Sequence, residues 1–463
     1  MIETTERFAA HIAGARFSDL GPADLAAART FLLDTLGVGI AGSSGAAVAR
    51  LTEAVRGWGE GEEATVWVTG ERLPAQAAAV VNAYQIHCLE YDCVHEGAVV
   101  HPMATVLSAL MAHAERRSAA GAPVSGAEFV TALAVGVDIA TLLGVAATGP
   151  VRFFRPATAG GLGATAAIAK LAGLGEDGIT NALGIAYGQT SGTLQPHAEG
   201  VPVLGLQIGF NARAALAAVD LALAGFRGPQ DIIDGPYGYL ALFEDGRYDL
   251  APVWERLGRE WQIARLSHKP FPSGRLTHGV VHALRTLTAE RGVAREEIVS
   301  VTGHVPPLVH RLVGRPDRPD PETNYAKLCL AYVAGAYLAR GQVDVPEFGD
   351  PAVLRDPAVH AAAAKVTLHP DGNPDENALC PQRFVFRLAD GREEEVRLAQ
   401  MYGHPDVPLT EAENRAKFER CLGYGARALP AGRGEALAAA VEGVARLEDA
   451  AELARLTVAE GTR

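Results

Sequence analysis

The first half of the chain is dominated by apolar residues that recur three and four positions apart. This spacing places them on one face of an α-helix, and Gly and Pro residues interrupt the pattern between segments. The segments predicted to be helical are Leu25–Ala41, Ala75–Leu89, Met103–Ala114, Glu128–Ala146, Leu162–Leu174 and Leu206–Ala224. We therefore expect a helical bundle that extends to about Phe226.

The pattern changes after residue 265. Asp390-Gly391 between two alternating runs predicts a β-hairpin. The segments after this change read as helices at Leu276–Glu290 and Tyr325–Ala339, as strands at Glu297–His304, Ala364–His369, Arg383–Leu388 and Glu393–Leu398, and as helices again at Leu409–Leu422 and Glu435–Leu456.

This order predicts a mostly α protein with two domains. Residues 1–265 begin a large all-α domain, residues 266–400 form a smaller inserted α+β domain, and residues 401–463 return to the helical domain. The crevice between two domains is a common place for a small-molecule site. We expect the active site there.

Composition narrows the class of partner. With 463 residues and 48% hydrophobic content the chain can bury a large core, but its net charge of −13 argues against nucleic acid or an anionic membrane as a partner. No uninterrupted apolar stretch of about 18 residues reads as a membrane span, and no secretory leader is expected, so a cytoplasmic protein is predicted. Five scattered cysteines without a CxxC pair predict no metal site.

The run Cys88–Ala104 is unusually polar for a segment between apolar helices. His101 precedes Pro102, so it should lie at the positive end of a helix dipole, which disfavours imidazolium and leaves a neutral base or donor. The alternative is that His101 only caps the helix. For Asp92, a catalytic role and a role as acceptor for loop N–H groups stay equally open. The neighbouring ionisable residues, singly more often solvated or structural, are Glu90, His95 and Glu96.

Two further segments carry positive charge. Ser267–His278 is a rigid loop before a helix, in which Lys269 and Arg275 predict an anion site, with Ser273 as a further substrate contact. A solvated basic loop is the alternative. Arg155, at the entry to a glycine-bearing helix, is a candidate second carboxylate clamp or else a surface residue. The glycines there are weak evidence for phosphate binding.

Taken in order, several segments resemble the MmgE/PrpD family, whose members act on small di- and tricarboxylic acids. The resemblance covers most of the chain. It rests on Phe31–Val38, Asn82 through His101-Pro102, Ala157–Ala164, Ala182–Ala186, Gly228 through Gly238, Lys269–Ser273 and Tyr325–Cys329. It implies a helical domain built from both chain ends, an inserted α+β domain, a homodimer, and a cleft active site without metal or organic cofactor.

The family pattern transfers only in part. The histidine of its His-Pro motif corresponds to His101, and the lysine of Lys-x-Phe-Pro to Lys269. Two of its acidic residues fall on Glu90 and Asp92. The family's other basic side chains are replaced at three positions, which are Arg155, Leu204 and Gly274. These departures favour a member with a changed substrate, and His95 is one place where specificity would differ.

The predicted function is a cofactor-independent dehydratase that removes a proton next to a carboxylate of a small hydroxylated di- or tricarboxylic acid. His101 is the predicted acid/base group, Asp92 orients it or shares the proton, and Lys269 is a carboxylate clamp or second acid. The predicted substrate contacts are Arg275, Arg155, Ser273, Glu90 and His95. An epimerase or isomerase, a decarboxylase, and a non-catalytic carboxylate-binding protein are the alternatives.

Overall fold

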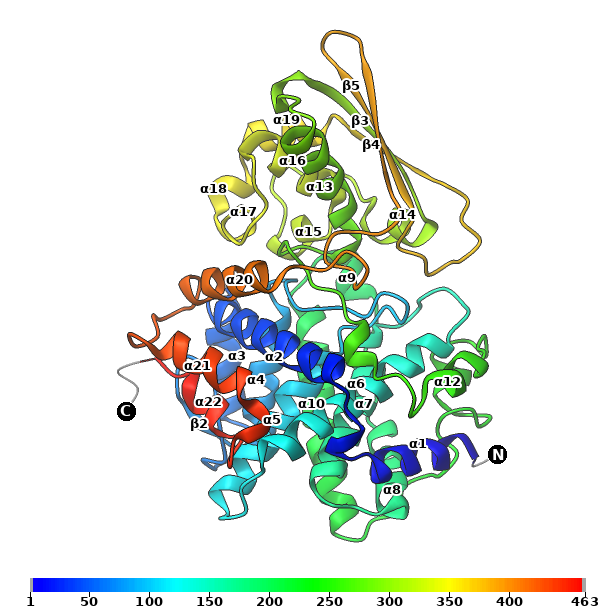
Figure 1. Cartoon of the computed structure of the whole chain (residues 1–463), viewed down its shortest axis with the longest axis vertical. Helices are drawn as coiled ribbons and strands as arrows, with labels where there is room; N and C mark the ends of the chain where they lie inside the picture. Colours follow the sequence, from blue (N-terminus) through cyan, green and yellow to red (C-terminus); the bar gives the residue numbers. More distant parts are fainter. Residues whose placement is uncertain (1–2, 460–463) are drawn as a thin grey trace.

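The computed structural model describes residues 3–459 and has a large helical part with a smaller α+β part standing on it (Figure 1). This arrangement confirms the predicted mostly α fold. The first part of the helical domain contains a short β1–β2 ladder, Ala64–Thr65 with Arg72–Leu73. Its helices are α1 Glu3–Gly14, α2 Pro22–Gly42, α3 Val48–Arg56, α4 Ala75–His87, α5 Pro102–Ala119, α6 Gly126–Ala146, α7 Arg155–Leu171, α8 Glu176–Tyr187, α9 Gln195–Glu199, α10 Val203–Leu223, α11 Tyr239–Leu242 and α12 Ala251–Arg256.

The last helices of the chain belong to the same helical core. They are α20 Glu411–Gly423, α21 Arg433–Glu442 and α22 Glu452–Leu456. Phe418, Leu437 and Leu453 are buried together with side chains of α2, α4 and α6. The prediction of a single helix at Glu435–Leu456 was wrong, because α21 ends before Gly443 and α22 begins only at Glu452.

The α+β part is a mixed four-stranded sheet with helices on one face. Strand order is β4-β3-β5-β6; β3 pairs in parallel with β4 and antiparallel with β5, and β5 pairs antiparallel with β6. The helices α13 and α16 pack against this sheet, and Val301, Phe384 and Tyr332 share one buried core. The elements are α13 His278–Arg285, β3 Ile298–Val305, α14 Pro307–Val313, α15 Thr323–Lys327, α16 Leu330–Arg340, α17 Pro346–Gly349, α18 Pro351–Leu354, α19 Pro357–Ala363, β4 Val366–Pro370, β5 Gln382–Leu388 and β6 Glu393–Leu398.

Two predicted helices of this part differ in their bounds. The helix predicted at Tyr325–Ala339 is divided into α15 and α16 around Leu328-Cys329, where the backbone leaves helical geometry. The one predicted at Leu276–Glu290 begins as a 3₁₀ turn and ends in a π-helical turn at Thr286–Glu290. The predicted β5–β6 hairpin is present, and Gly391 adopts a left-handed φ of 87° in its turn. A side chain there would be strained.

Among the described residues, three helices reach membrane-spanning length, although charged residues interrupt each apolar stretch, as Asp138 does in Gly126–Ala146. By length and composition alone, Pro22–Gly42, Gly126–Ala146 and Val203–Leu223 are long and apolar enough. In the structure, 94% of the most apolar window, in α6, is buried inside the protein. Its apolar length is used to cross the centre of the helical core, where helices pack on several sides of it.

Candidate functional site

The loop between α4 and α5 carries the polar run and is fastened to the segment that enters the α+β part. Val94 and Ser267 exchange backbone hydrogen bonds of 3.0 and 2.7 Å, and His95 and Val100 close the loop on itself. Glu90 takes a left-handed φ of 54° at the start of the loop. These constraints bring Lys269 beside Glu90, although 179 positions separate the two residues.

Five side chains form a line of close charged contacts, which we call the charge chain. Lys269 Nζ donates to Glu90 Oε2 at 2.8 Å, and Glu90 Oε1 lies 3.2 Å from Nε2 of His87. Nδ1 of His87 lies 3.1 Å from both carboxylate oxygens of Asp92, and Asp92 Oδ2 lies 3.4 Å from Nδ1 of His101. The structure thus brings together four residues predicted from the sequence and adds His87.

The charge chain is almost closed to solvent. Burial alone would lower the pKa of His87, but the carboxylates of Asp92 and Glu90 outweigh it and raise that pKa to about 9. Against the penalty of burial, Lys269 and His87 hold the pKa of the Glu90 carboxyl well below its usual range, and His87 and His101 do the same for Asp92. From Lys269 to Asp92, the side chains of the charge chain are therefore alternately positive and negative.

That last member, His101, is neutral and faces a cavity. Burial and the nearby ammonium of Lys269 lower its pKa. His101 Nδ1 donates to the carbonyl oxygen of Cys93 at 2.9 Å, so in the neutral ring Nδ1 carries the hydrogen and Nε2 is the acceptor. His101 occupies the N-cap position of α5, but its side chain makes no capping hydrogen bond. The capping alternative therefore does not account for the ring.

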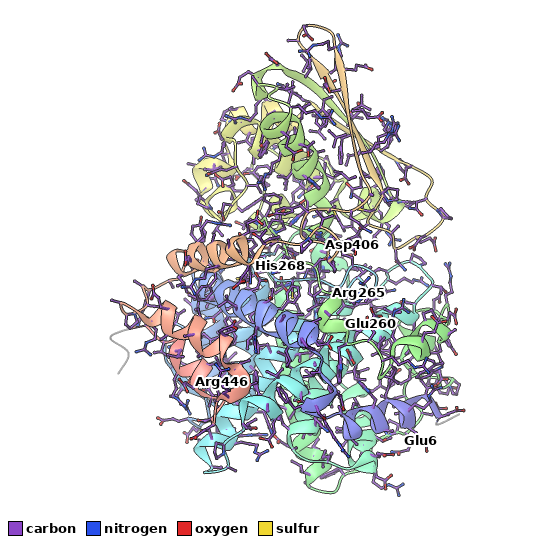
Figure 2. The ribbon with its side chains drawn as sticks, viewed as in Figure 1. Glu6, Glu260, Arg265, His268, Asp406 and Arg446 are labelled. Carbon is purple, nitrogen blue, oxygen red and sulfur yellow. The ribbon has the colours of Figure 1, made fainter. Side chains whose placement is uncertain are left out.

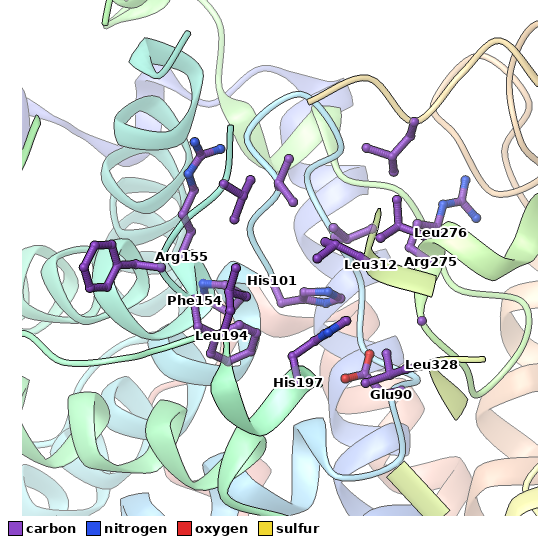
Figure 3. A pocket seen from close by; sticks show the side chains of 17 residues that line it. Glu90, His101, Phe154, Arg155, Leu194, His197, Arg275, Leu276, Leu312 and Leu328 are labelled. Carbon is purple, nitrogen blue, oxygen red and sulfur yellow. The ribbon is translucent and has the colours of Figure 1, made fainter. Parts of the chain in front are cut away.

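The cavity lies between the helical part and the α+β part, and its empty space of about 630 Å³ includes open solvent at its mouth. Figure 3 shows His101 and His197 projecting into it, with Glu90 beyond them. His197 comes from the short helix α9 and was not predicted as a site residue. The rest of the wall is mainly apolar, and its apolar side chains are Val94, Val99, Val151, Phe153, Phe154, Pro156, Leu194, Leu276, Leu312, Leu328 and Leu379.

Both predicted arginines line this cavity but are already paired. Arg155 donates to Glu244 from Nε and Nη2 at 2.8 and 2.7 Å, and the two side chains are 1% and 3% exposed. Arg275 lies 2.7 Å from Glu96 and also donates to carbonyl oxygens of the returning chain. In Figure 3 both guanidinium groups point away from the two histidines. Their predicted roles as carboxylate clamps stay predictions, and these ion pairs argue against them.

The remaining predicted contacts serve the loop structure. His95 accepts a hydrogen bond from Ala98 N at Nδ1, and its Nε2 lies 3.2 Å from the Gln262 side-chain oxygen. The Ser273 hydroxyl lies 2.9 Å from the Thr277 hydroxyl. Neither residue lines the cavity. Their predicted substrate contacts also stay predictions.

Lys327 is a buried lysine that the sequence did not single out. Its Nζ donates to the carbonyl oxygen of Cys88 at 2.9 Å, and burial lowers its pKa to about 8. Its amine therefore loses a proton more readily than the amine of an exposed lysine does, at a pH near 8.

Three side chains of the charge chain have the atoms that a metal ion needs. One ligand atom each of His87, Asp92 and His101 lie within 4.8 Å of one another. Two imidazoles and one carboxylate suit zinc and similar ions. In the structure these atoms are engaged with one another or with the Cys93 carbonyl.

Comparison with known proteins identifies the chain's relatives. The MmgE/PrpD N-terminal domain matches residues 6–250 and the MmgE/PrpD C-terminal domain matches residues 271–442. A cis-aconitate decarboxylase of Mus musculus is 29% identical over 98% of this chain and 93% of its own length. The cis-aconitate decarboxylase-like protein oryM of Aspergillus oryzae is 30% identical over 87% and 88%, and the Homo sapiens cis-aconitate decarboxylase 29% over 89% and 86%. With both domains matched in order along the chain, the protein belongs to the MmgE/PrpD family.

Proposed function

We propose that this protein is a lyase that acts on a small organic acid by moving a proton at the carbon next to a carboxylate. One observation carries the proposal: a neutral His101 faces the cavity with Nε2 free to accept a proton, while Nδ1 is fixed by Cys93 and Asp92. When the ring takes up a proton, the Asp92 carboxylate stabilises the imidazolium, as an aspartate does for histidine in hydrolase triads.

Loss of carbon dioxide is the first reaction we propose. The bond to the carboxylate carbon breaks, its electron pair stays on the substrate and carbon dioxide leaves. His101, which first takes up a proton from solvent at Nε2, gives that proton to carbon. The apolar cavity wall supports this reaction. A carboxylate held against that wall loses its hydration without gaining hydrogen-bond partners, which favours its departure as neutral carbon dioxide. The relatives named as decarboxylases support it too.

Loss of water, the dehydratase reaction expected from the sequence, is the second candidate. His101 would take the proton next to the carboxylate, and a second group would protonate the departing hydroxyl. His197 projects into the same cavity and supports this alternative (Figure 3). Epimerisation has less support, because it requires a second base, and His197 accepts a hydrogen bond from Arg315 at the one nitrogen that lacks a hydrogen.

One screen separates the candidates. Small hydroxy, oxo and unsaturated acids with one to three carboxylates are incubated with the enzyme in deuterated water and followed by mass spectrometry. Decarboxylation gives a product lighter by carbon dioxide that carries one deuterium, dehydration gives an alkene lighter by water, and epimerisation adds deuterium without other loss. Turnover that survives unchanged in His101→Asn refutes the proposal, and tight binding without conversion favours a non-catalytic binding protein.

The same proposal includes independence of metal and organic cofactor, a homodimer and a cytoplasmic location. Light scattering on the purified full chain tests the dimer, and cell fractionation tests the location.

A further inference from the structure

Three cations in or beside the cavity already have a carboxylate partner. The pairs are Arg155 with Glu244, Arg275 with Glu96 and Lys269 with Glu90, with nitrogen–oxygen distances of 2.7, 2.7 and 2.8 Å. All six side chains are buried. A substrate carboxylate that displaced one of these glutamates would leave it unpaired and out of water. The charges of these three cations are therefore compensated within the protein.

Arg315 differs from these cations, although it lies against residues of the same cavity. Its Nη2 donates to the carbonyl oxygens of His197 and Leu312 at 2.9 and 3.0 Å, and both of these residues line the cavity. Within residues 3–459 it makes no ion pair with a carboxylate, and its buried Nη1 has no hydrogen-bond partner. Burial lowers the pKa of Arg315, but a guanidinium stays protonated in proteins. Its positive charge is thus left uncompensated.

His197 carries a donor from Arg315 to the cavity. Arg315 Nη2 lies 3.0 Å from His197 Nδ1, and because a guanidinium only donates, Nδ1 is the acceptor and Nε2 carries the hydrogen. Burial and Arg315 lower the pKa of His197 to about 4, so the ring stays neutral. Figure 3 shows this ring projecting into the cavity. An N–H group backed by a guanidinium is a stronger donor than an isolated one, because linked hydrogen bonds polarise each other.

The charge chain does not cancel the field of Arg315. Its two positive side chains are Lys269 and His87, and its two negative side chains are Glu90 and Asp92, so their charges sum to zero. The next member, His101, is neutral. An uncompensated buried cation is unfavourable by itself and is stabilised by an anion nearby. The corner of the cavity at His197 is therefore suited to an anion.

The apolar wall offers no second donor of this kind. Leucine, valine and phenylalanine side chains supply most of that wall. A carboxylate pressed against it loses its hydration and finds no hydrogen-bond donor. A substrate with two or more carboxylates thus gains most when one of them meets His197, and a carboxylate that lies against the wall is left desolvated.

We infer that the corner formed by His197 and Arg315 binds a carboxylate of the substrate, the one that stays on it. Nε2 of His197 donates to that carboxylate, and Arg315 is a positioning residue that fixes the tautomer of the ring and supplies the positive charge. This inference rests on the proposed function for the identity of the cavity as the active site. It goes beyond that function by naming the group that binds the anion and by fixing the orientation of the substrate.

Two variants of His197 test the donor. Binding of tricarballylate, a saturated tricarboxylate, is measured by calorimetry with the full-length protein. His197→Leu removes the donor and should weaken binding at least about tenfold, as expected for a hydrogen bond to a charged group. His197→Gln keeps a side-chain N–H and should bind like the parent protein. Unchanged binding by folded His197→Leu, or no binding of tricarballylate to the parent protein, overturns the inference.

Variants of Arg315 test the charge. Arg315→Met should also weaken binding at least about tenfold, and Arg315→Lys, which keeps a positive charge, should recover most of the loss. The matched control is Arg318→Met. The exposed guanidinium of Arg318 lies 3.9 Å from the ring of Tyr325, and that of Arg315 lies 4.9 Å from the same ring. Arg318→Met should bind like the parent, and a loss equal to that of Arg315→Met would show that the effect is general charge. Circular dichroism checks folding, and if Arg315→Met does not fold, the His197 variants decide the test.

Turnover of an acid found in the screen above gives a second measurement. Removal of an interaction that is equal in the ground and transition states raises KM and leaves kcat unchanged. Arg315→Met should therefore raise KM about tenfold with kcat nearly unchanged, and a fall in kcat at constant KM overturns the carboxylate-binding role. Tricarballylate binding that depends on both residues, without conversion of any acid in the screen, refutes the proposed function and leaves this inference standing.

Discussion

Nδ1 of His87 lies 3.1 Å from each of the two carboxylate oxygens of Asp92, in a position closed to solvent. The folded-state pKa of His87 is about 9, above the ordinary value of 6.5. A group with a raised pKa stabilises the folded protein fully below its unfolded pKa and loses that effect as the pH rises through its folded pKa. The free energy of unfolding should thus fall by about 3 kcal/mol between pH 6.5 and 9.

Urea unfolding at a series of pH values measures this dependence. The His87→Gln variant lacks the titrating ring and should show a flatter curve over the same range. If the variant and the parent protein lose stability in parallel, the charged state of His87 is not the cause.

Replacing His101 by asparagine should reduce turnover by about a hundredfold to ten-thousandfold, the usual contribution of a general acid or base. A control is His369→Asn, since His369 is exposed on β4 of the α+β part and should retain parent activity. The lowered pKa of His101 also places the pH at which the rate changes below 6.5: as a base His101 loses activity below that pH, and as an acid it loses activity above it. Steady-state kinetics across pH give both results, and similar rates for the two variants would refute the assignment.

Lys269 and Glu90 should show strong coupling in a double-mutant cycle. Lys269→Met leaves a buried carboxylate without its ammonium, and Glu90→Gln leaves the reverse, so each change alone should cost about 3–5 kcal/mol of folding stability. The double variant removes both charges and should fall short of the sum by about 0.5–3 kcal/mol. Chemical unfolding of the four proteins checks this, and simple additivity would show that the pair is not coupled.

Glu244→Gln should destabilise the protein and free Arg155. The buried guanidinium loses its counter-ion, so about 3 kcal/mol of unfolding free energy should be lost. In the folded fraction, the unpaired cation should increase affinity for tricarballylate. The control is Glu376→Gln, whose partner Arg247 is half exposed, and the expected loss there is under about 1 kcal/mol. Unfolding and calorimetry on both variants are the measurements, and an unchanged tricarballylate affinity in stable Glu244→Gln would contradict the charge argument.

Removal of metal should leave turnover unchanged. The atoms of His87, Asp92 and His101 that lie within 4.8 Å of one another would instead make added zinc an inhibitor, because a bound ion occupies the base. Activity is measured after dialysis against a chelator and again with zinc added. Loss of activity on chelation, with recovery on adding metal, would assign these three residues to a metal centre.

Local patterns were sufficient for much of the fold and part of the site. The helix start at Pro102 and the Asp390-Gly391 turn are set by the backbone preferences of a few neighbouring residues. The charged run after α4 was recognised because ionisable groups are rare between apolar helices. The predicted helix bounds were wrong where no Gly or Pro marks the end of a helix, as at Leu328-Cys329 within the predicted helix Tyr325–Ala339.

The pairing of charges could not be predicted. The sequence did not show that Arg155 is paired, because its partner Glu244 lies 89 positions further along the chain. His87 read as part of an apolar helix, although its place five residues before Asp92 was an available signal. His197 carries no local pattern at all, and only its contact with Arg315, 118 positions away, fixes its tautomer.

Arg275 has a consequence for how the inserted part is attached. His268 N donates to Gly403 O at 2.9 Å, and Arg275 donates to the carbonyls of His268, Met401 and Tyr402. These hydrogen bonds hold the segment that enters the α+β part beside the segment that leaves it, near His268 in Figure 2. Other contacts join the two parts elsewhere, such as the hydrogen bond from Lys327 Nζ to the carbonyl oxygen of Cys88. The arginine predicted to hold substrate therefore fixes the spacing between the two segments that enter and leave the α+β part.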